Sequence, residues 1–137
     1  MTLGEKQEAF AALVPRLLDK AHELGFKVRL GETHRSDAQA ELNALGTKGR
    51  AHLASMIQGG YTTLAAAIRR GGNGIKYSAH RNKLAIDIHL FKDGAYLSQT
   101  SDHAALGAWW EQQHPSARWG GHFSDGNHYS FEHDGVK

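Results

Sequence analysis

The chain has 137 residues, of which 40% are hydrophobic and 22% charged, with 16 Lys and Arg against 14 Asp and Glu. These proportions are typical of a single globular domain over residues 1–137 and argue against disorder. A net charge of +2 gives no electrostatic case for nucleic-acid binding, although a weakly basic chain suits an anionic polymer such as cell wall. Cysteine is absent, which excludes disulfides, thiolate metal sites and cysteine nucleophiles, so His, Asp or Glu must hold any metal.

Charged residues occur throughout the first 20 residues, which contain no unbroken apolar segment. This pattern is typical of neither a signal peptide nor a membrane-spanning helix. We therefore expect a protein that is made in the cytoplasm and does not insert into the membrane. A substrate outside the membrane would then require a second protein for release.

Apolar residues recur at every third or fourth position over residues 5–25, which predicts an amphipathic helix that ends at Gly25. Pro15 stands in the middle of this pattern and is expected to split or kink the helix. Residues 26–33 then alternate apolar and polar side chains, which predicts a strand.

Two further helical stretches are expected before the middle of the chain ends. The first runs from Ser36 or Asp37 to about Leu45, with Ser36 as its N-cap. The second covers roughly residues 50–69 and is broken by the glycine pair at 59–60.

The predicted strands are concentrated in the second half of the chain. Glycine-rich residues 71–74 indicate a loop, and residues 84–90 alternate large apolar with small or polar side chains, as a half-buried strand does. Residues 101–113 predict a helix, and residues 128–132 predict a last strand. This order predicts an α+β fold in one domain, with helices packed on a small, mainly antiparallel sheet.

Histidine is the unusual component of the composition, with ten residues in the chain. His80 and Asp87 are seven positions apart, so a continuous helix would separate them by about 10 Å along its axis. A shared zinc ion needs both donor atoms about 2 Å away. The chain must therefore turn between them, and residues 81–83 are polar enough to form that turn. Asp87 then lies on the polar face of its strand, opposite Ile86 and Ile88.

The last strand offers a third ligand. His128 opens it, and Asp125 stands three residues earlier in an Asp-x-x-His arrangement. A carboxylate beside a ligand can take the proton of a metal-activated water without binding the metal. Three protein ligands and one open position are the catalytic arrangement for zinc. Spacing alone leaves His128 one candidate among several, because a lone histidine is more often a packed or surface residue than a ligand.

Four short motifs follow one another along the chain: THRSDAQ at 33–39, SAHRNKLAID at 78–87, RWGG at 118–121 and DGNH at 125–128. In this order they resemble motifs of the D-alanyl-D-alanine carboxypeptidase and L-alanyl-D-glutamate endopeptidase family of zinc peptidases. That family includes bacteriophage endolysins and vancomycin-resistance dipeptidases. The second motif resembles its Ser-x-His-(x)6-Asp signature, and the last resembles its acid-x-x-His segment.

The resemblance implies a ligand set and a mechanism. It assigns the zinc ligands to His80, Asp87 and His128, and the general base to Asp125. It also implies that an arginine polarises the scissile carbonyl and stabilises the oxyanion, with a glutamine supporting it. These two residues correspond to Arg35 and Gln39; without the resemblance, Arg35 would be interpreted as a surface ion-pair partner.

Two positions depart from the family pattern. Lys83 replaces a glycine between the first two ligands, so the turn must form without glycine's freedom at positive φ and its shape is expected to differ. Ser130 replaces a carboxylate that would support a ligand, which removes a charge near the metal.

Several residues around the motifs keep alternative interpretations. Ser78 can hydrogen-bond a substrate or cap a turn, and both alternatives stay open. Trp119, beside the glycine turn, is expected to form a wall of the substrate cleft. Rival metal ligands are His89, which is more simply interpreted as a polar residue at the edge of the cleft, and His122 and His133, which flank His128.

The expected function is zinc-dependent hydrolysis of the peptidoglycan stem peptide by an L-alanyl-D-glutamate endopeptidase. We expect a monomeric phage or prophage endolysin that accumulates in the host cytoplasm and reaches the wall after release by a separate holin-like protein. One alternative is a D-alanyl-D-alanine carboxypeptidase or dipeptidase that uses the same site. Another is a catalytically inactive, zinc-stabilised module that binds cell wall.

Overall fold

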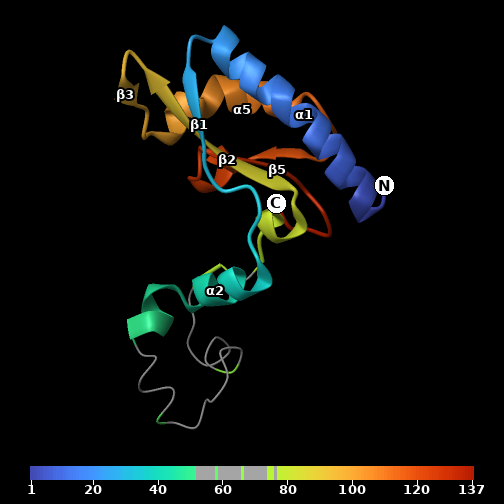
Figure 1. Cartoon of the computed structure of the whole chain (residues 1–137), viewed down its shortest axis with the longest axis vertical. Coiled ribbons are helices and arrows are strands. Elements are labelled where there is room, and N and C mark those ends of the chain that lie inside the picture. The colour runs from blue at the N-terminus through green and yellow to red at the C-terminus, as the bar shows by residue number, and fades with distance from the viewer. Residues whose placement is uncertain (52–57, 59–65, 67–73, 76) are drawn as a thin grey trace.

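The computed structural model describes residues 1–51, 58, 66, 74–75 and 77–137 (Figure 1). Most of the helix expected over residues 50–69, and most of the glycine-rich loop expected at 71–74, lie outside these residues. In the part that is described, an antiparallel sheet is combined with separate helices, which confirms the predicted α+β class.

The first helix, α1, spans Leu3–Glu23 and is held at both ends by backbone capping. Thr2 and Glu5 form a reciprocal capping box at its start. At its end Gly25, with φ of 87°, donates to the His22 carbonyl, and the next residue donates to Ala21, a Schellman arrangement. The predicted end at Gly25 is therefore confirmed.

The expected split at Pro15 does not occur, since α1 is a single helix from Leu3 to Glu23 with Pro15 inside it. Proline cannot donate the hydrogen bond that a helix needs at this position. Pro15 lies on the exposed face, where water can satisfy the carbonyl that the missing bond leaves free. The opposite face packs into the core through residues at helical spacing: Phe10, Leu13, Leu17 and Ala21.

The sheet contains five strands among the described residues, and every pairing is antiparallel. They are β1 (Lys27–Leu30), β2 (Ala85–Lys92), β3 (Ala95–Tyr96), β4 (Ala117–Trp119) and β5 (His128–Phe131). The strand order is β1-β2-β5-β4, with β3 also paired to β2. The two strands that were predicted to carry metal ligands, β2 and β5, are therefore neighbours at the centre.

Helices α1 and α5 (Ala104–Glu111) lie together against the sheet (Figure 1). Trp110 of α5 is fully buried, with its ring centroid 5.9 Å from that of Phe10 and 5.7 Å from that of Phe131. Its indole N–H donates to the Ser130 carbonyl at 3.2 Å. The predicted helix over residues 101–113 thus exists, but its first turn is the 3-10 helix η2 (Thr100–His103).

The helix α2 (Asp37–Ala51) begins with Ser36, whose hydroxyl accepts a hydrogen bond from the Gln39 N–H at 3.2 Å. This confirms the predicted N-cap. Gly46 takes non-helical angles, φ 58° and ψ −168°, and interrupts the element one residue after Leu45. The predicted end of the first helical segment is therefore correct, although helical residues resume beyond it.

Two more short 3-10 helices, η1 (Ala79–Asn82) and η3 (Gly120–Phe123), precede the ligand-bearing strands β2 and β5. Across the residues that the structure describes, no helix combines the length and apolar character needed to cross a membrane.

Candidate metal centre

The pairing of β2 with β5 places two of the predicted ligands directly opposite each other. Asp87 pairs with His128, while the next pair along, Ile86 and Tyr129, points into the core. Residues opposite one another in an antiparallel pair project from the same face, with Cβ atoms about 5 Å apart. The sheet register therefore fixes one carboxylate and one imidazole side by side.

The third ligand, His80, is brought to this pair by a turn of η1. Ser78 caps the turn, because its hydroxyl accepts from the His80 N–H at 3.3 Å. Lys83 ends it with φ of 54° and ψ of 36°, and the Leu84 N–H returns to the Ala79 carbonyl at 3.0 Å. The predicted turn over residues 81–83 is confirmed.

Lys83, which replaces the glycine of the family pattern, lies at the end of this turn. Lys83 itself adopts the left-handed conformation that glycine occupies without strain. A non-glycine residue adopts this conformation at a cost of about 1–2 kcal/mol. The turn to Asp87 therefore forms without glycine, and the cost falls on the backbone of one residue.

The three ligand atoms form a nearly equilateral triangle. His80 Nε2 lies 3.1 Å from Asp87 Oδ1 and 3.2 Å from His128 Nδ1, and the latter two atoms are 3.1 Å apart. Ligand atoms about 2.0–2.1 Å from a tetrahedral zinc ion lie about 3.3 Å from one another. This group could therefore hold a metal ion with little rearrangement, and it is the one such group among the described residues.

Hydrogen bonding around His80 supports a cation at this point. Its Nδ1–H donates to the Thr33 carbonyl at 3.4 Å, which leaves the Nε2 lone pair directed at the triangle. Such a carbonyl partner is typical of metal-bound histidines. His80 and His128 are only 2% and 5% exposed, so little water can separate the converging lone pairs. A bound cation would relieve their mutual repulsion.

The electrostatics of Asp87 are consistent with a ligand carboxylate. Burial disfavours its charged form, but the neighbouring imidazoles of His128 and His80 outweigh that effect and hold its pKa well below the ordinary value. Asp87 is therefore an anion at neutral pH, in a site otherwise made of two imidazoles.

Residues 31–35 continue along β2 beyond the end of β1. The Gly31 N–H donates to the Asp87 carbonyl and the Asp87 N–H to the Glu32 carbonyl, both at 2.8 Å. The Arg35 N–H then donates to the His80 carbonyl at 3.2 Å. These bonds tie the segment that carries Glu32 and Arg35 directly to the backbone of two candidate ligands.

Arg35 forms a bidentate ion pair, as its interpretation without the family resemblance predicted, with a partner that was not identified from the sequence. Its Nε and Nη2 donate to the two carboxylate oxygens of Glu32 at 2.7 and 2.6 Å. The pKa of Glu32 is lowered, first by the hydrogen bonds from Arg35. Arg35 also lies within the electrostatic reach of Asp87 and Asp125, which contribute to raising its own pKa after the bonds from Glu32. Glu32 was missed, although its spacing of three from Arg35 was a visible signal.

Asp125 is held beside the triad by the backbone of the loop that enters β5. Its N–H donates to the Gly120 carbonyl at 2.9 Å, and its carbonyl accepts from the His128 N–H at 3.1 Å. Partial burial of its carboxyl group raises the pKa of that group, although the residue as a whole is exposed. His128, Asp87, His80 and Arg35 all contribute to its electrostatic environment, which places it in the same cluster.

The glycine pair of the RWGG motif has a steric reason. A Cβ added to Gly120 would lie 2.2 Å from the Asp125 carbonyl oxygen and 2.8 Å from the Cβ of His128. A Cβ added to Gly121 would lie 2.2 Å from the indole ring of Trp119. The motif therefore allows close packing around Asp125 and His128 and does not supply a positive φ angle.

The three predicted substrate-binding residues occupy different settings. Ser78 caps η1, which is one of its two alternatives, and the exposed Gln39 contacts the Asn43 side chain, with 2.7 Å between the amides. The ring of Trp119 packs against Gly121, and its N–H donates to a loop carbonyl at 2.8 Å. These contacts are structural, and substrate contacts of all three stay predictions.

The rival histidines lie outside the triad and have partners of their own. His89 contacts the Tyr96 hydroxyl at 3.4 Å, and the exposed His122 pairs with Glu111 at 3.0 Å. His133 lies 3.5 Å from Asp134. These contacts favour their interpretation as polar residues that do not belong to the candidate ligand group.

The imidazole of His128, the third candidate ligand, has few polar contacts outside the triad. Ser130 is fully buried, and its hydroxyl points to the Arg118 carbonyl at 3.5 Å. His128 Nε2 is buried and has no hydrogen-bond partner within the described part of the chain. The partly exposed Phe123 lies near the same imidazole, with 6.0 Å between ring centroids. His128 is therefore oriented by its strand and by the triad.

No protein-family model matches the chain, and no curated protein matches it in sequence. The likeness to the zinc peptidase family therefore rests on the four motifs, and the interpretation of the site rests on its geometry.

Proposed function

We propose that the chain is a zinc-dependent peptidase that hydrolyses the stem peptide of peptidoglycan, as an L-alanyl-D-glutamate endopeptidase. One observation carries the proposal: the ligand atoms of His80, Asp87 and His128 converge within 3.2 Å, with Asp125 on the loop that enters the strand of the last ligand. A purely structural zinc site is closed by four protein ligands. The three-ligand group favours a catalytic site.

Zinc is the metal that this donor set suits best. Two imidazole nitrogens and one carboxylate oxygen, without thiolates, are typical ligands of catalytic zinc in hydrolases. Magnesium and calcium prefer sites made entirely of oxygen donors. When bound, zinc supplies a Lewis acid that polarises a carbonyl and lowers the pKa of a coordinated water.

The chain's own residues then handle the proton and the developing charge. Asp125, with its raised pKa, is suited to take a proton from the attacking water and to return it to the leaving amine. Arg35 offers guanidinium N–H groups that can stabilise negative charge on the carbonyl oxygen. Its pairing with Glu32 holds the guanidinium in place before substrate arrives.

The substrate class follows from the resemblance of the four motifs to the wall-peptidase family. In that setting the enzyme acts as a phage or prophage endolysin, released to the wall by a separate holin-like protein. The small net charge of +2 is compatible with an anionic wall polymer.

Mass spectrometry of purified peptidoglycan after digestion tests the proposal. Zinc-loaded protein should release fragments with new N-terminal D-Glu, and a chelator should abolish them. Free D-Ala instead would identify a D-alanyl-D-alanine carboxypeptidase. Binding of the protein to the wall without any cleavage would contradict enzymatic function and favour an inactive wall-binding module.

A further inference from the structure

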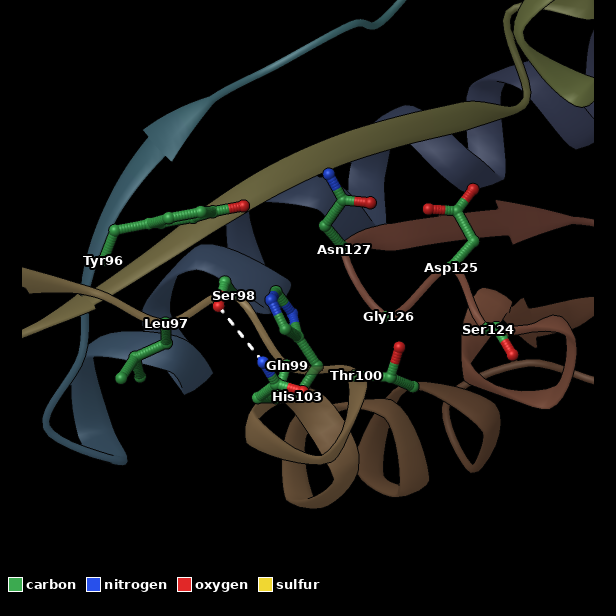
Figure 2. A pocket seen from close by; sticks show the side chains of 10 residues that line it. All are labelled: Tyr96, Leu97, Ser98, Gln99, Thr100, His103, Ser124, Asp125, Gly126 and Asn127. Carbon is green, nitrogen blue, oxygen red and sulfur yellow. Dashed lines mark hydrogen bonds between the residues drawn. The ribbon is translucent and has the colours of Figure 1, made fainter.

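A polar groove opens beside Asp125, on residues that the metal triad does not use. Its volume is about 150 Å³. The residues that line it include Tyr96, Thr100, His103, Asp125 and Asn127. Figure 2 shows Asn127 between Tyr96 and Asp125 in this view, with Thr100 below Gly126. Since Asp125 is the proposed proton donor to the leaving amine, a groove lined by Asp125 is placed to receive the leaving-group side of the cleaved bond.

Gly126, in the lining of the groove, packs closely against η2. A Cβ added to Gly126 would lie 2.6 Å from the Cα of Thr100. The Gly126 carbonyl accepts from the indole N–H of Trp119, and the Asn127 carbonyl accepts from the Ile88 N–H at 3.0 Å. The wall formed by Gly126 and Asn127 is therefore held by one side-chain and one backbone hydrogen bond.

The side chains that line the groove carry little charge. Among the residues that line the groove, Asp125 is the one carboxylate, and no Lys or Arg is present. The other polar side chains are hydroxyls, amides and one imidazole. An anionic ligand group would meet a carboxylate and no Lys or Arg side chain in the lining, whereas a neutral amide could both donate and accept hydrogen bonds.

His103 supplies a directed donor to this groove. Its side chain is 2% exposed, and its Nδ1 lies 2.9 Å from the Tyr129 hydroxyl. Among the described residues that hydroxyl contacts no other acceptor, so we assign its proton to the bond with Nδ1 and the ring proton to Nε2. Burial also lowers the pKa of His103, which favours the neutral ring. The remaining N–H is then available to an acceptor in the groove.

We infer that this groove selects a neutral carboxamide over a carboxylate on the residue that follows the cleaved bond, with His103 and Asn127 as specificity-determining residues. The inference rests on the proposed peptidase function and extends it to the amidation state of the substrate. For an L-alanyl-D-glutamate bond, the relevant group is the α-carboxyl of the glutamate, free or amidated.

Two synthetic peptides that differ only in this group provide the kinetic test. The zinc-loaded wild type should cleave the amidated peptide with a kcat/KM about tenfold higher, as expected for one unfavourable charge contact at partial exposure. Asn127→Lys places a cation in the groove and should reverse the preference, while Thr100→Val, which removes one hydroxyl, should keep its direction. Equal use of both peptides by wild type and by Asn127→Lys would overturn the inference.

A binding measurement separates this inference from the proposed function. The amidated and free-acid forms of the product dipeptide are titrated into ¹⁵N-labelled wild type and followed by NMR. The amidated form should shift the His103 Nε2–H and Asn127 side-chain signals at lower concentration than the acid. If neither peptide is cleaved but these signals shift selectively, the peptidase proposal fails and the groove assignment holds. Shifts that avoid both residues would refute the groove assignment, whether or not the peptides are cleaved.

Discussion

The candidate ligands and the proposed reacting groups stand on different kinds of structure. His80, Asp87 and His128 lie on η1 and on the two central strands, with side-chain exposures of 2%, 21% and 6%. Arg35 and Asp125 lie on loops at either side of these strands, and Asp125 is exposed. The candidate ligand group is fixed by the two central strands and η1, whereas Arg35 and Asp125 are fixed by loop hydrogen bonds.

This difference predicts that the two regions fail separately. Removing a ligand should abolish metal binding, since nothing on the loops completes the triad within the described residues. Removing a loop group should leave the metal in place and reduce turnover. Substitutions that act on both regions should be those at positions where a loop packs directly on a ligand.

The largest effect is expected from His80→Ala. The variant leaves two ligands, and zinc affinity should fall more than about 100-fold, beyond the loss typical of removing an outer-shell partner. Zinc content after dialysis and isothermal titration calorimetry measure it. The exposed His122, paired with Glu111, provides the control His122→Ala, which should bind zinc like the wild type. Full zinc occupancy in His80→Ala would refute the ligand set.

Asp125→Asn tests the role of the proposed reacting groups on the loops. The amide keeps the shape of the side chain but cannot take a proton, so kcat should fall about 10²–10⁴-fold while zinc binding is retained. Asp134→Asn is a matched control, because Asp134 is 88% exposed and lies outside the triad. Wild-type turnover in Asp125→Asn would remove Asp125 from the mechanism.

Gly120→Ala should affect both regions. The added Cβ would approach the Asp125 carbonyl at 2.2 Å and the His128 Cβ at 2.8 Å, so the loop must move. We expect a loss of about 1–3 kcal/mol in the free energy of unfolding, as for other overpacked sites, and a larger relative loss of activity than of zinc. Gly4→Ala, where nothing lies within 4 Å, serves as control in urea unfolding. Unchanged stability and activity in Gly120→Ala would show that the loop tolerates displacement.

The positions of the candidate metal ligands could largely be predicted from the sequence, because side chains alternate strictly between the two faces of a strand. Alternation placed Asp87 on the polar face of β2, and the start of β5 placed His128, so only the register remained to be fixed. The turn that delivers His80 was required by the seven-residue spacing. The motif resemblance then selected His128 from the other histidines.

The loop side was less predictable because its geometry depends on contacts between distant segments. The strand predicted to end at residue 33 gave no sign that residues 31–35 bond to β2 and η1, so Glu32 was not identified as the partner of Arg35. Trp119 was expected at a cleft wall, but its packing between Gly107 and Gly121 depends on how α5 meets η3. The local sequence pattern predicts neither hydrogen bonds between distant segments nor the packing of one helix against another.

Lys83→Gly sharpens the account of the turn between ligands. Glycine relieves the left-handed strain at φ of 54° but gains entropy in the unfolded chain, so the net stabilisation should be up to about 1 kcal/mol. Urea unfolding of the zinc-free protein measures it. Lys83→Ala removes the same side chain without relieving the strain and should not gain stability. Equal stabilities of the glycine and alanine variants would mean that the strain is negligible.

The smallest effect is expected where a loop group is held by an exposed ion pair. Glu32 is 31% exposed in its side chain, so Glu32→Gln should cost only about 0.5–1 kcal/mol of unfolding free energy at neutral pH. The pKa of Glu32 is lowered in the folded state from 4.5, so the pair's contribution is fully present above that pH and is lost as the pH falls through the lower folded value. The stability difference between wild type and Glu32→Gln should therefore shrink during acid titration. A difference that stays constant from neutral to strongly acidic pH would show that Arg35 is positioned by its backbone bond to His80 and not by Glu32.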